Sequence, residues 1–258
     1  MHPNSVERLP FTLTESSVLA IIPARFHATR LPGKILADIA GHPMIEHVYR
    51  RTAAARLVHA TIVATDDERI ARAVESFGGA AIMTRTDHVS GTDRLAEVAA
   101  QVACRLVVNV QGDEPLIEPG TIDAAVAPML ADAALEMSTL SRPLAGDHEL
   151  TSRSVVKVVT DLRGRALYFS RSAMPGSAAH VGLYVYRRDV LLKLAALPPA
   201  PLETLESLEQ LRALSNGIGI QVVSTIHASA GVDTPADLER VRHLMMAAPH
   251  EGAPYMAS

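Results

Sequence analysis

The 258-residue chain has no tryptophan, a single cysteine and only 3% aromatic residues. One cysteine excludes both a disulfide framework and a cysteine-based metal cluster. With so few aromatic side chains, the core must be built from alanine, valine, leucine, isoleucine and methionine. Cys104 follows Val102 and Ala103 at the end of a predicted helix. We therefore expect a buried, unreactive thiol.

Long apolar runs and an excess of positive charge are also missing. No segment approaches the ~18 apolar residues of a membrane span, and residues 1–17 lack the apolar centre of a signal peptide. The net charge of −4 and the pI near 6.3 argue against nucleic acid as the main partner. We expect a cytoplasmic protein without membrane insertion, with a flexible N-terminal extension (1–17) and a flexible C-terminal tail (247–258).

Several catalytic motifs are absent as well. The sequence contains no H-E-x-x-H or histidine–cysteine metal pattern and no G-x-S-x-G nucleophile elbow. The segment Ile22 to Lys34, which reads IPARFHATRLPGK, is not a Walker P-loop, because Ile35 follows Lys34 and position 28 is not glycine. It nevertheless places Arg25, Arg30 and Lys34 directly after an apolar run. Fixed cations and exposed backbone N–H groups at the end of a buried strand predict a polyphosphate site.

Apolar strands alternate with amphipathic helices through the first half of the chain. The strands are predicted over 18–22, 61–64, 80–83 and 106–110. One helix is predicted to begin at Pro43, a second to follow a capping box from Thr65 to Glu68, and a third to span 92–102. This alternation predicts an α/β fold with a parallel sheet and helices on both faces. Ligands of such sheets bind at the carboxyl ends of the strands, where the basic segment lies.

The second half has a different pattern. A hairpin is predicted over 155–160 and 165–170, strands over 180–186 and 220–223, and long helices over 201–216 and 234–246. We therefore divide the chain into a nucleotide-binding part (18–140) and a smaller substrate-binding and dimerisation part (141–246), for which the family resemblance described below implies a sugar as the substrate.

Two carboxylates are candidate metal ligands. Asp113 lies in Val-Gln-Gly-Asp-Glu-Pro, directly after the most apolar strand, and Asp233 lies in Gly-Val-Asp-Thr-Pro before the last helix. Mg²⁺ commonly takes one or two carboxylates and completes its shell with water and phosphate oxygens. A turn role for Asp113 and a helix-capping role for Asp233 are the alternatives. Ser90 or Thr92 could cap the helix that follows, which explains part of the segment 83–94. Capping gives no role to Arg85 and His88, which follow a short strand and could face a base or a phosphate.

Taken together, these segments resemble the CMP-Kdo synthetases, the 3-deoxy-manno-octulosonate (Kdo) cytidylyltransferases. The resemblance runs in order from about Val18 to Val241 and rests on TRLPGK, MTRTDHVSGTDR, VVNVQGDEPLI, HVGLY, LEQLR and GVDTPADL. It implies a Rossmann-like nucleotidyltransferase fold, as in nucleotide-diphospho-sugar transferases, with a mixed, mostly parallel sheet and a smaller α+β part. It also implies a Mg²⁺-dependent homodimer that converts CTP and Kdo into CMP-Kdo and diphosphate for lipopolysaccharide synthesis.

The resemblance also implies roles for individual residues. Catalysis would fall to Lys34, Arg25 and Asp113, and Mg²⁺ binding to Asp113 and Asp233. The nucleotide would be bound by Arg25, Arg30, Lys34, Arg85 and Gln111. The sugar acid would be bound by Gln111, Arg171, His180, Glu209 and Gln210.

The chain departs from the family pattern between Arg171 and His180. Only residues 172–179, SAMPGSAA, intervene, where family members usually carry a longer basic loop with an arginine just before the histidine; here Ala179 takes that place. Two alternatives therefore stay open. One is a cytidylyltransferase for a related 3-deoxy or amino ulosonic acid, and the other is a non-catalytic nucleotide-binding paralogue.

Overall fold

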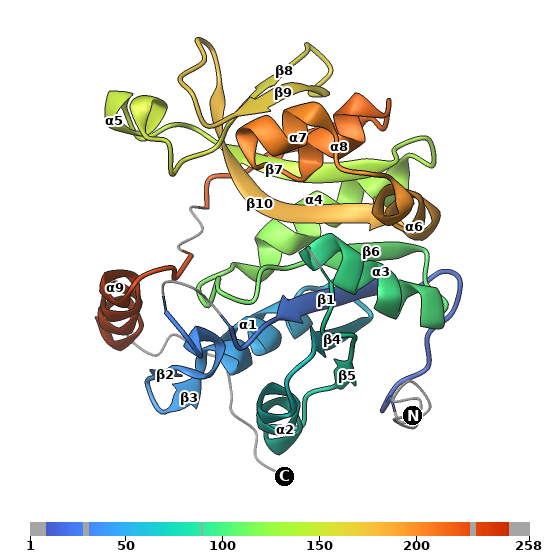
Figure 1. The fold of residues 1–258 in the computed structure, drawn as a ribbon, viewed down its shortest axis with the longest axis vertical. Coiled ribbons are helices and arrows are strands. Elements are labelled where there is room, and N and C mark those ends of the chain that lie inside the picture. Colours follow the sequence, from blue (N-terminus) through green and yellow to red (C-terminus); the bar gives the residue numbers. More distant parts are fainter. Residues whose placement is uncertain (1–8, 28–30, 89, 228–230, 248–258) are drawn as a thin grey trace.

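The computed structural model describes residues 9–27, 31–88, 90–227 and 231–247. These residues are arranged around one large sheet, which has nine strands in the described ranges (Figure 1). Its main path runs β11-β7-β10-β6-β1-β4-β5, and the hairpin of β8 and β9 is attached to β10. The strands are β1 (Val18–Ala24), β4 (Ala60–Thr65), β5 (Ala81–Met83), β6 (Leu106–Asn109), β7 (Met137–Arg142), β8 (Lys157–Thr160), β9 (Ala166–Ser170), β10 (Ala178–Arg187) and β11 (Ile220–Ser224).

The strands of the main path are parallel except for one. β1 pairs in parallel with β4 and β6, β4 with β5, and β11 with β7, whereas β10 is antiparallel to both β6 and β7. The predicted mixed, mostly parallel sheet is confirmed, as is the β8–β9 hairpin. Because β10 alone is reversed, the carboxyl ends of β1, β4, β6 and β7 lie along one edge of the sheet.

Helices cover both faces of the sheet, as the alternation predicted. The helices of the described residues are α1 (Met44–Ala53), α2 (Glu68–Ser76), α3 (Gly91–Gln101), α4 (Pro119–Ala131), α5 (Asp147–Thr151), α6 (Arg188–Ala196), α7 (Pro201–Glu206), α8 (Gln210–Ser215) and α9 (Pro235–Ala247). A short 3₁₀ helix η2 (Lys34–Leu36) and a two-stranded sheet of β2 (Asp38–Ile39) and β3 (His42–Pro43) precede α1. None of the helices among the described residues is long and apolar enough to span a membrane.

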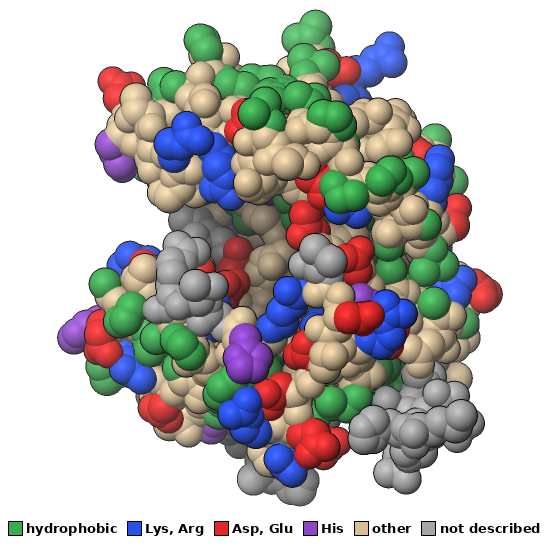
Figure 2. All heavy atoms as spheres, in the orientation of Figure 1, with side chains coloured by type: hydrophobic (Ala, Val, Ile, Leu, Met, Phe, Trp, Pro, Cys, Tyr) green, Lys and Arg blue, Asp and Glu red, His purple; other side chains and the backbone are tan. Residues whose placement is uncertain are grey.

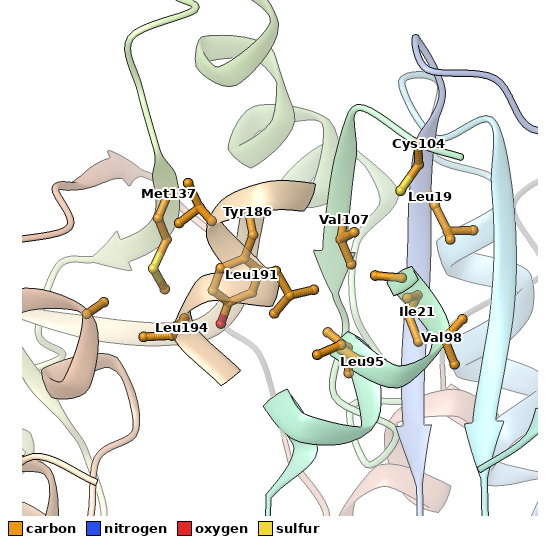
Figure 3. Close-up of a cluster of buried hydrophobic side chains, with 14 of the residues drawn as sticks. Leu19, Ile21, Leu95, Val98, Cys104, Val107, Met137, Tyr186, Leu191 and Leu194 are labelled. Carbon is orange, nitrogen blue, oxygen red and sulfur yellow. The ribbon is translucent and has the colours of Figure 1, made fainter. Parts of the chain in front are cut away.

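The core has two sides because side chains of a strand alternate between faces. Leu19 and Ile21 of β1 pack with residues of α3, α6 and α8, whereas Ala20 and Ile22 pack with residues of α1, α2 and α4. Figure 3 shows the first of these clusters, which includes Cys104. Burial raises the pKa of the Cys104 thiol to about 11, so the predicted buried thiol is confirmed.

Two local predictions are wrong. Thr65 ends β4 instead of capping a helix, and the side chain of Asp67 caps α2 by accepting a hydrogen bond from the backbone N–H of Arg69. The single helix over 201–216 is two short helices, because Ser207 adopts a left-handed conformation (φ 54°, ψ 50°) that ends α7. The alternative in which Ser90 caps α3 is confirmed, with Asp93 completing the capping box.

The C-terminal helix returns to the N-terminal half of the chain. Buried Val232, Leu238 and Val241 form a small cluster with Ile39 and Met44, so α9 packs beside β2 and β3 (Figure 1). The main sheet also continues across residue 140, since β7 and β10 pair with each other and β10 pairs with β6. Segments far apart in the sequence therefore meet at the carboxyl edge of β1 and β6.

Candidate active site

Lys34 lies at the centre of a charged cluster at this edge. Gly33 adopts φ +71° where the loop after β1 turns into η2, and a Cβ there would lie 3.1 Å from the Phe26 ring. The turn brings the Lys34 ammonium 2.5 Å from Asp113 Oδ2 and 3.1 Å from Asp233 Oδ1. Its third partner is the carbonyl oxygen of Val232, at 2.8 Å. All three N–H donors of the ammonium are thus used.

The surroundings keep Lys34 charged. Its side chain is only 12% exposed. Burial alone lowers the pKa of Lys34, but attraction and hydrogen bonds to Asp113 and Asp233 outweigh burial and raise it above the ordinary value. Lys34 is therefore charged at neutral pH, and an ammonium group can bind phosphate oxygens as well as carboxylates.

The two carboxylates are held by different parts of the chain. Gly112 lets the segment after β6 pass close to β1, since a Cβ at this position would lie 3.0 Å from the carbonyl oxygen of Pro23. The backbone N–H of Val232 donates to the carbonyl of Asp113 at 2.9 Å, which aligns Asp233 beside Lys34. Thr234 and Asp237 exchange capping hydrogen bonds at the start of α9. The capping role considered for Asp233 is thus filled by its neighbours.

The predicted arginines of the nucleotide site differ in their surroundings. Arg25, just beyond β1, donates from Nη2 to the carbonyl oxygen of His88 at 3.1 Å, so it joins the loops after β1 and β5. Arg85 is exposed and forms an ion pair with Asp87 (2.9 Å). Arg30 lies outside the described residues. A role of Arg85 in nucleotide binding stays a prediction.

Two adjoining cavities, of about 240 Å³ and 320 Å³, open beside this cluster. Both are lined by Gln111, Tyr184, Leu208 and Gln210. The smaller one, which we call the inner cavity, also borders Thr92, Asn109, Glu209 and Arg212; the larger, outer cavity borders Arg142, the segment 154–156 and His180. Figure 2 shows a hollow, with acidic and basic side chains inside it, between the part carrying α5, β8 and β9 and the part carrying α9.

The inner cavity is lined by hydrogen-bonding groups. Glu209 accepts a hydrogen bond from Thr92 Oγ1 at 2.6 Å, which joins α3 to the start of α8. Asn109 Oδ1 and Gln210 Nε2 are buried and have no hydrogen-bond partner within the described residues. Gln111 donates weakly to the carbonyl of Gly182 at 3.3 Å. A ligand with several hydroxyl groups would supply the donors and acceptors that these side chains need.

His180 gives the outer cavity a neutral ring. Burial lowers the pKa of His180 to about 3, so the imidazole is uncharged at neutral pH. Its Nε2 lies 2.9 Å from Thr139 Oγ1, and the Thr139 hydroxyl donates to the carbonyl of Leu183 at 2.8 Å. The hydroxyl must therefore accept from Nε2–H, which leaves Nδ1 as the acceptor of the ring.

Arg171 lies beside the cavities rather than among their lining residues. Its Nε donates to the carbonyl of Glu206 at 3.2 Å and its Nη1 to the carbonyl of Arg153 at 3.2 Å. Direct contact between Arg171 and a sugar acid stays a prediction.

The structure adds Arg142, which the sequence did not single out. The register of β7 and β10 places Arg142 opposite Ala179, and its side chain lines the outer cavity. Glu149 accepts hydrogen bonds from both Nη atoms (2.8 and 2.7 Å) and fixes the guanidinium. The position before His180 lacks a cation, but the neighbouring strand supplies one. Arg142 and Ala179 are 37 residues apart in the sequence, so only the pairing of β7 with β10 shows that the cation lies beside this position.

Comparison with known proteins gives consistent matches. Residues 19–221 match a protein family described as Cytidylyltransferase. The chain is 57% identical over 244 residues to the 3-deoxy-manno-octulosonate cytidylyltransferase of Geobacter sulfurreducens, covering 87% of this chain and 98% of that protein. For the protein of the same name from Geobacter metallireducens, the identity is 55% over 243 residues, covering 87% and 96%.

A solved structure is also similar to this chain. It is that of CMP:2-keto-3-deoxy-manno-octonic acid synthetase complexed with CTP, with 48% identity and a TM-score of 0.87, covering 90% of this chain and 99% of that chain. Together with the sheet topology, this similarity confirms the predicted nucleotidyltransferase fold.

Proposed function

The chain belongs to the 3-deoxy-manno-octulosonate cytidylyltransferase family, and on that basis we propose that it transfers the cytidylyl group of CTP to Kdo. The products are CMP-Kdo, the activated sugar used for lipopolysaccharide synthesis, and diphosphate. One observation carries the proposal: the Lys34–Asp113–Asp233 cluster lies at the carboxyl edge of the sheet, beside two cavities that share Gln111.

The chemistry requires little covalent work from the protein. The anomeric 2-hydroxyl of Kdo attacks the α-phosphorus of CTP, a new P–O bond forms, the bond to the β-phosphate breaks, and the hydroxyl proton is lost to solvent. Such reactions depend mainly on positioning and charge neutralisation. Lys34 and Arg25 serve both needs, because they bring fixed positive charge to the end of β1, where the leaving diphosphate carries its negative charge.

The two carboxylates fit a role in binding Mg²⁺. Asp113 and Asp233 lie within 2.5 Å and 3.1 Å of one cationic nitrogen, so both can reach one metal ion. Two carboxylates, with water and phosphate oxygens, make a donor set that suits Mg²⁺. When bound, Mg²⁺ would lower the pKa of the sugar hydroxyl and neutralise phosphate charge. Until substrates arrive, the Lys34 ammonium keeps the two carboxylates together.

The cavities are assigned to the sugar acid. Neutral His180, Glu209 and Gln210 offer the acceptors and donors that a polyhydroxylated ring needs, and Gln111 borders both cavities. Arg142 adds a cation to the outer cavity. These groups support an anionic, hydroxyl-rich acceptor despite the short loop over 172–179.

We further propose a cytoplasmic homodimer. CTP is supplied in the cytoplasm, which favours that location. Figure 2 shows hydrophobic side chains gathered at the top of the molecule, where Figure 1 places α7 and the β8–β9 hairpin. Leu162, Leu167 and Leu205 of these elements are all more than 60% exposed. An apolar surface of this kind favours an interface, and light scattering would detect a monomer for Leu205→Glu if the interface lies here.

The direct test is diphosphate release from CTP and Mg²⁺ with Kdo, measured against a panel of related ulosonic acids. Rapid release with Kdo is expected. Turnover with another acid but not with Kdo would transfer the assignment to that acid. Binding of CTP without turnover of any acid would indicate the non-catalytic paralogue.

A further inference from the structure

The most deeply buried charge beside the outer cavity belongs to Lys157, which none of the roles above uses. Lys157 is the first residue of β8, and its side chain is fully buried (0% exposed). The ammonium donates to the carbonyl oxygens of Ser152 (2.5 Å), Val155 (2.9 Å) and Arg171 (3.0 Å). All three of its N–H donors are thus satisfied by backbone carbonyls.

Among the described residues, the ammonium contacts no carboxylate. Burial, together with repulsion from Arg153 and Arg171, lowers the pKa of Lys157. A buried charge is costly unless it is well hydrogen-bonded. The cost is offset here by three carbonyl dipoles that converge on one nitrogen, so the ammonium holds their backbone segments together.

The first of these segments is a wall of the outer cavity. Ser154, Val155 and Val156 line that cavity. Most of the backbone carbonyls of this segment accept hydrogen bonds from other parts of the chain. The carbonyls of Ser152 and Val155 accept from Lys157, that of Arg153 from Arg171, and that of Val156 from the backbone N–H of His180 (2.8 Å). The segment 152–156 has no regular ladder of its own and depends on these contacts.

The second segment is the short loop over 172–179. It begins after Arg171, whose carbonyl accepts from the Lys157 ammonium, and ends at Ala179, which pairs with the backbone of Lys157 in the β8–β10 register. One residue therefore anchors both ends of this loop and the wall of the outer cavity, which Arg142 also lines.

We propose that Lys157 is the positioning residue of the acceptor pocket: its ammonium holds the 152–156 wall and the 172–179 loop in the shape that receives the sugar acid. This inference rests on the proposed function. Lys157 touches neither substrate, and it acts through the carbonyls that it gathers.

The test compares Lys157→Met, which removes all three donors at nearly constant size, with Lys157→Gln, which keeps two. Lys193→Met, on the exposed side of α6, is the matched control. For Lys157→Met we expect a KM for the sugar acid raised about tenfold, corresponding to a wall that is correctly ordered about a tenth of the time. The dissociation constant of CTP, measured by calorimetry, should stay within twofold of wild type. Lys157→Gln should be intermediate.

Amide hydrogen exchange supplies a readout that does not depend on turnover. Exchange should speed up in 152–156 and 172–179 of the variants, and not in the strands β1 and β6. An unchanged sugar KM with unchanged exchange would overturn the inference, and so would an equal loss of CTP and sugar affinity. If Lys157→Met fails to fold, the sugar KM and the amide exchange of Lys157→Gln, each compared with wild type, test the inference instead. If wild type releases no diphosphate with any acid, the proposed function fails instead, while the exchange data still test the wall.

Discussion

Replacing Asp113 with asparagine would remove one of the two negative charges that contact the Lys34 ammonium. The lost contact is a charge-assisted hydrogen bond of 2.5 Å between partly buried groups. Such bonds contribute about 1.5–3 kcal/mol, and asparagine keeps a neutral acceptor of similar shape. We therefore expect the free energy of unfolding to fall by about 1–2 kcal/mol. A domain stability of about 5–15 kcal/mol tolerates that loss.

The effect on activity should be larger than the effect on stability. Removing one preorganised electrostatic group commonly costs about 10²–10³ in kcat, and here the same carboxylate is assigned to Mg²⁺. Urea unfolding and diphosphate release, measured on the same preparation, separate the two quantities. Wild-type kcat/KM in Asp113→Asn would refute the metal-ligand assignment.

A matched control lies close by. Asp237 caps α9 by accepting from the backbone N–H and the hydroxyl of Thr234 (3.0 and 2.8 Å), four residues from Asp233. Because asparagine keeps an acceptor at this capping position, Asp237→Asn should cost less than about 1 kcal/mol of stability and leave turnover nearly unchanged. If it lost as much activity as Asp113→Asn, general loosening of the site would explain both.

Three further predictions concern a histidine that lines the outer cavity and two buried groups. Because the folded-state pKa of His180 is lowered to about 3 from 6.5, the unfolded chain takes up the proton first; stability should fall as the pH drops below about 6.5, by up to about 1.4 kcal/mol per pH unit, and His180→Gln should flatten this decline in urea unfolding. Cys104, with its pKa raised to about 11, should resist iodoacetamide at about pH 8 until urea unfolds the chain, and rapid native labelling would contradict its burial. Glu203→Gln should lower the free energy of unfolding by about 3–5 kcal/mol, because it leaves the buried Arg212 guanidinium without its carboxylate; a thermal shift close to zero would contradict this.

The sequence predicts those features that depend on near neighbours. Apolar strands in alternation with helices are enough for the sheet and its two helical layers, and the strand before Gln111 places Asp113 at the ligand-binding edge. Lys34 could be singled out for the same reason, because it follows the strand that ends at Ala24.

Features that depend on distant segments were predicted less well. Asp233 is 199 residues from Lys34, and its position before a helix left a metal-ligand role and a capping role both open until the family resemblance implied one Mg²⁺ site with Asp113. Arg142 was missed because its place in the cavity depends on the β7–β10 register. The break at Ser207 has no glycine or proline to mark it, and the ion pair of Glu203 with Arg212, closed across that break, is a tertiary contact.

The three carbonyls that accept hydrogen bonds from Lys157 have a consequence for how the range of sugar acids can change during evolution or in the laboratory. The charged cluster at Lys34 meets the outer cavity at the segment after β6, where Asp113 lies between the lining residues Gln111 and Glu114. The 152–156 wall and the 172–179 loop belong to other segments, so they can diverge separately from the cluster. The wall and the start of the short loop, however, both have backbone carbonyls that accept hydrogen bonds from a single nitrogen, that of Lys157. Replacing either segment alone with that of a relative would leave the buried Lys157 ammonium without part of its carbonyl partners. We therefore expect 152–157 and 171–179 to be inherited together, and they should be transplanted together.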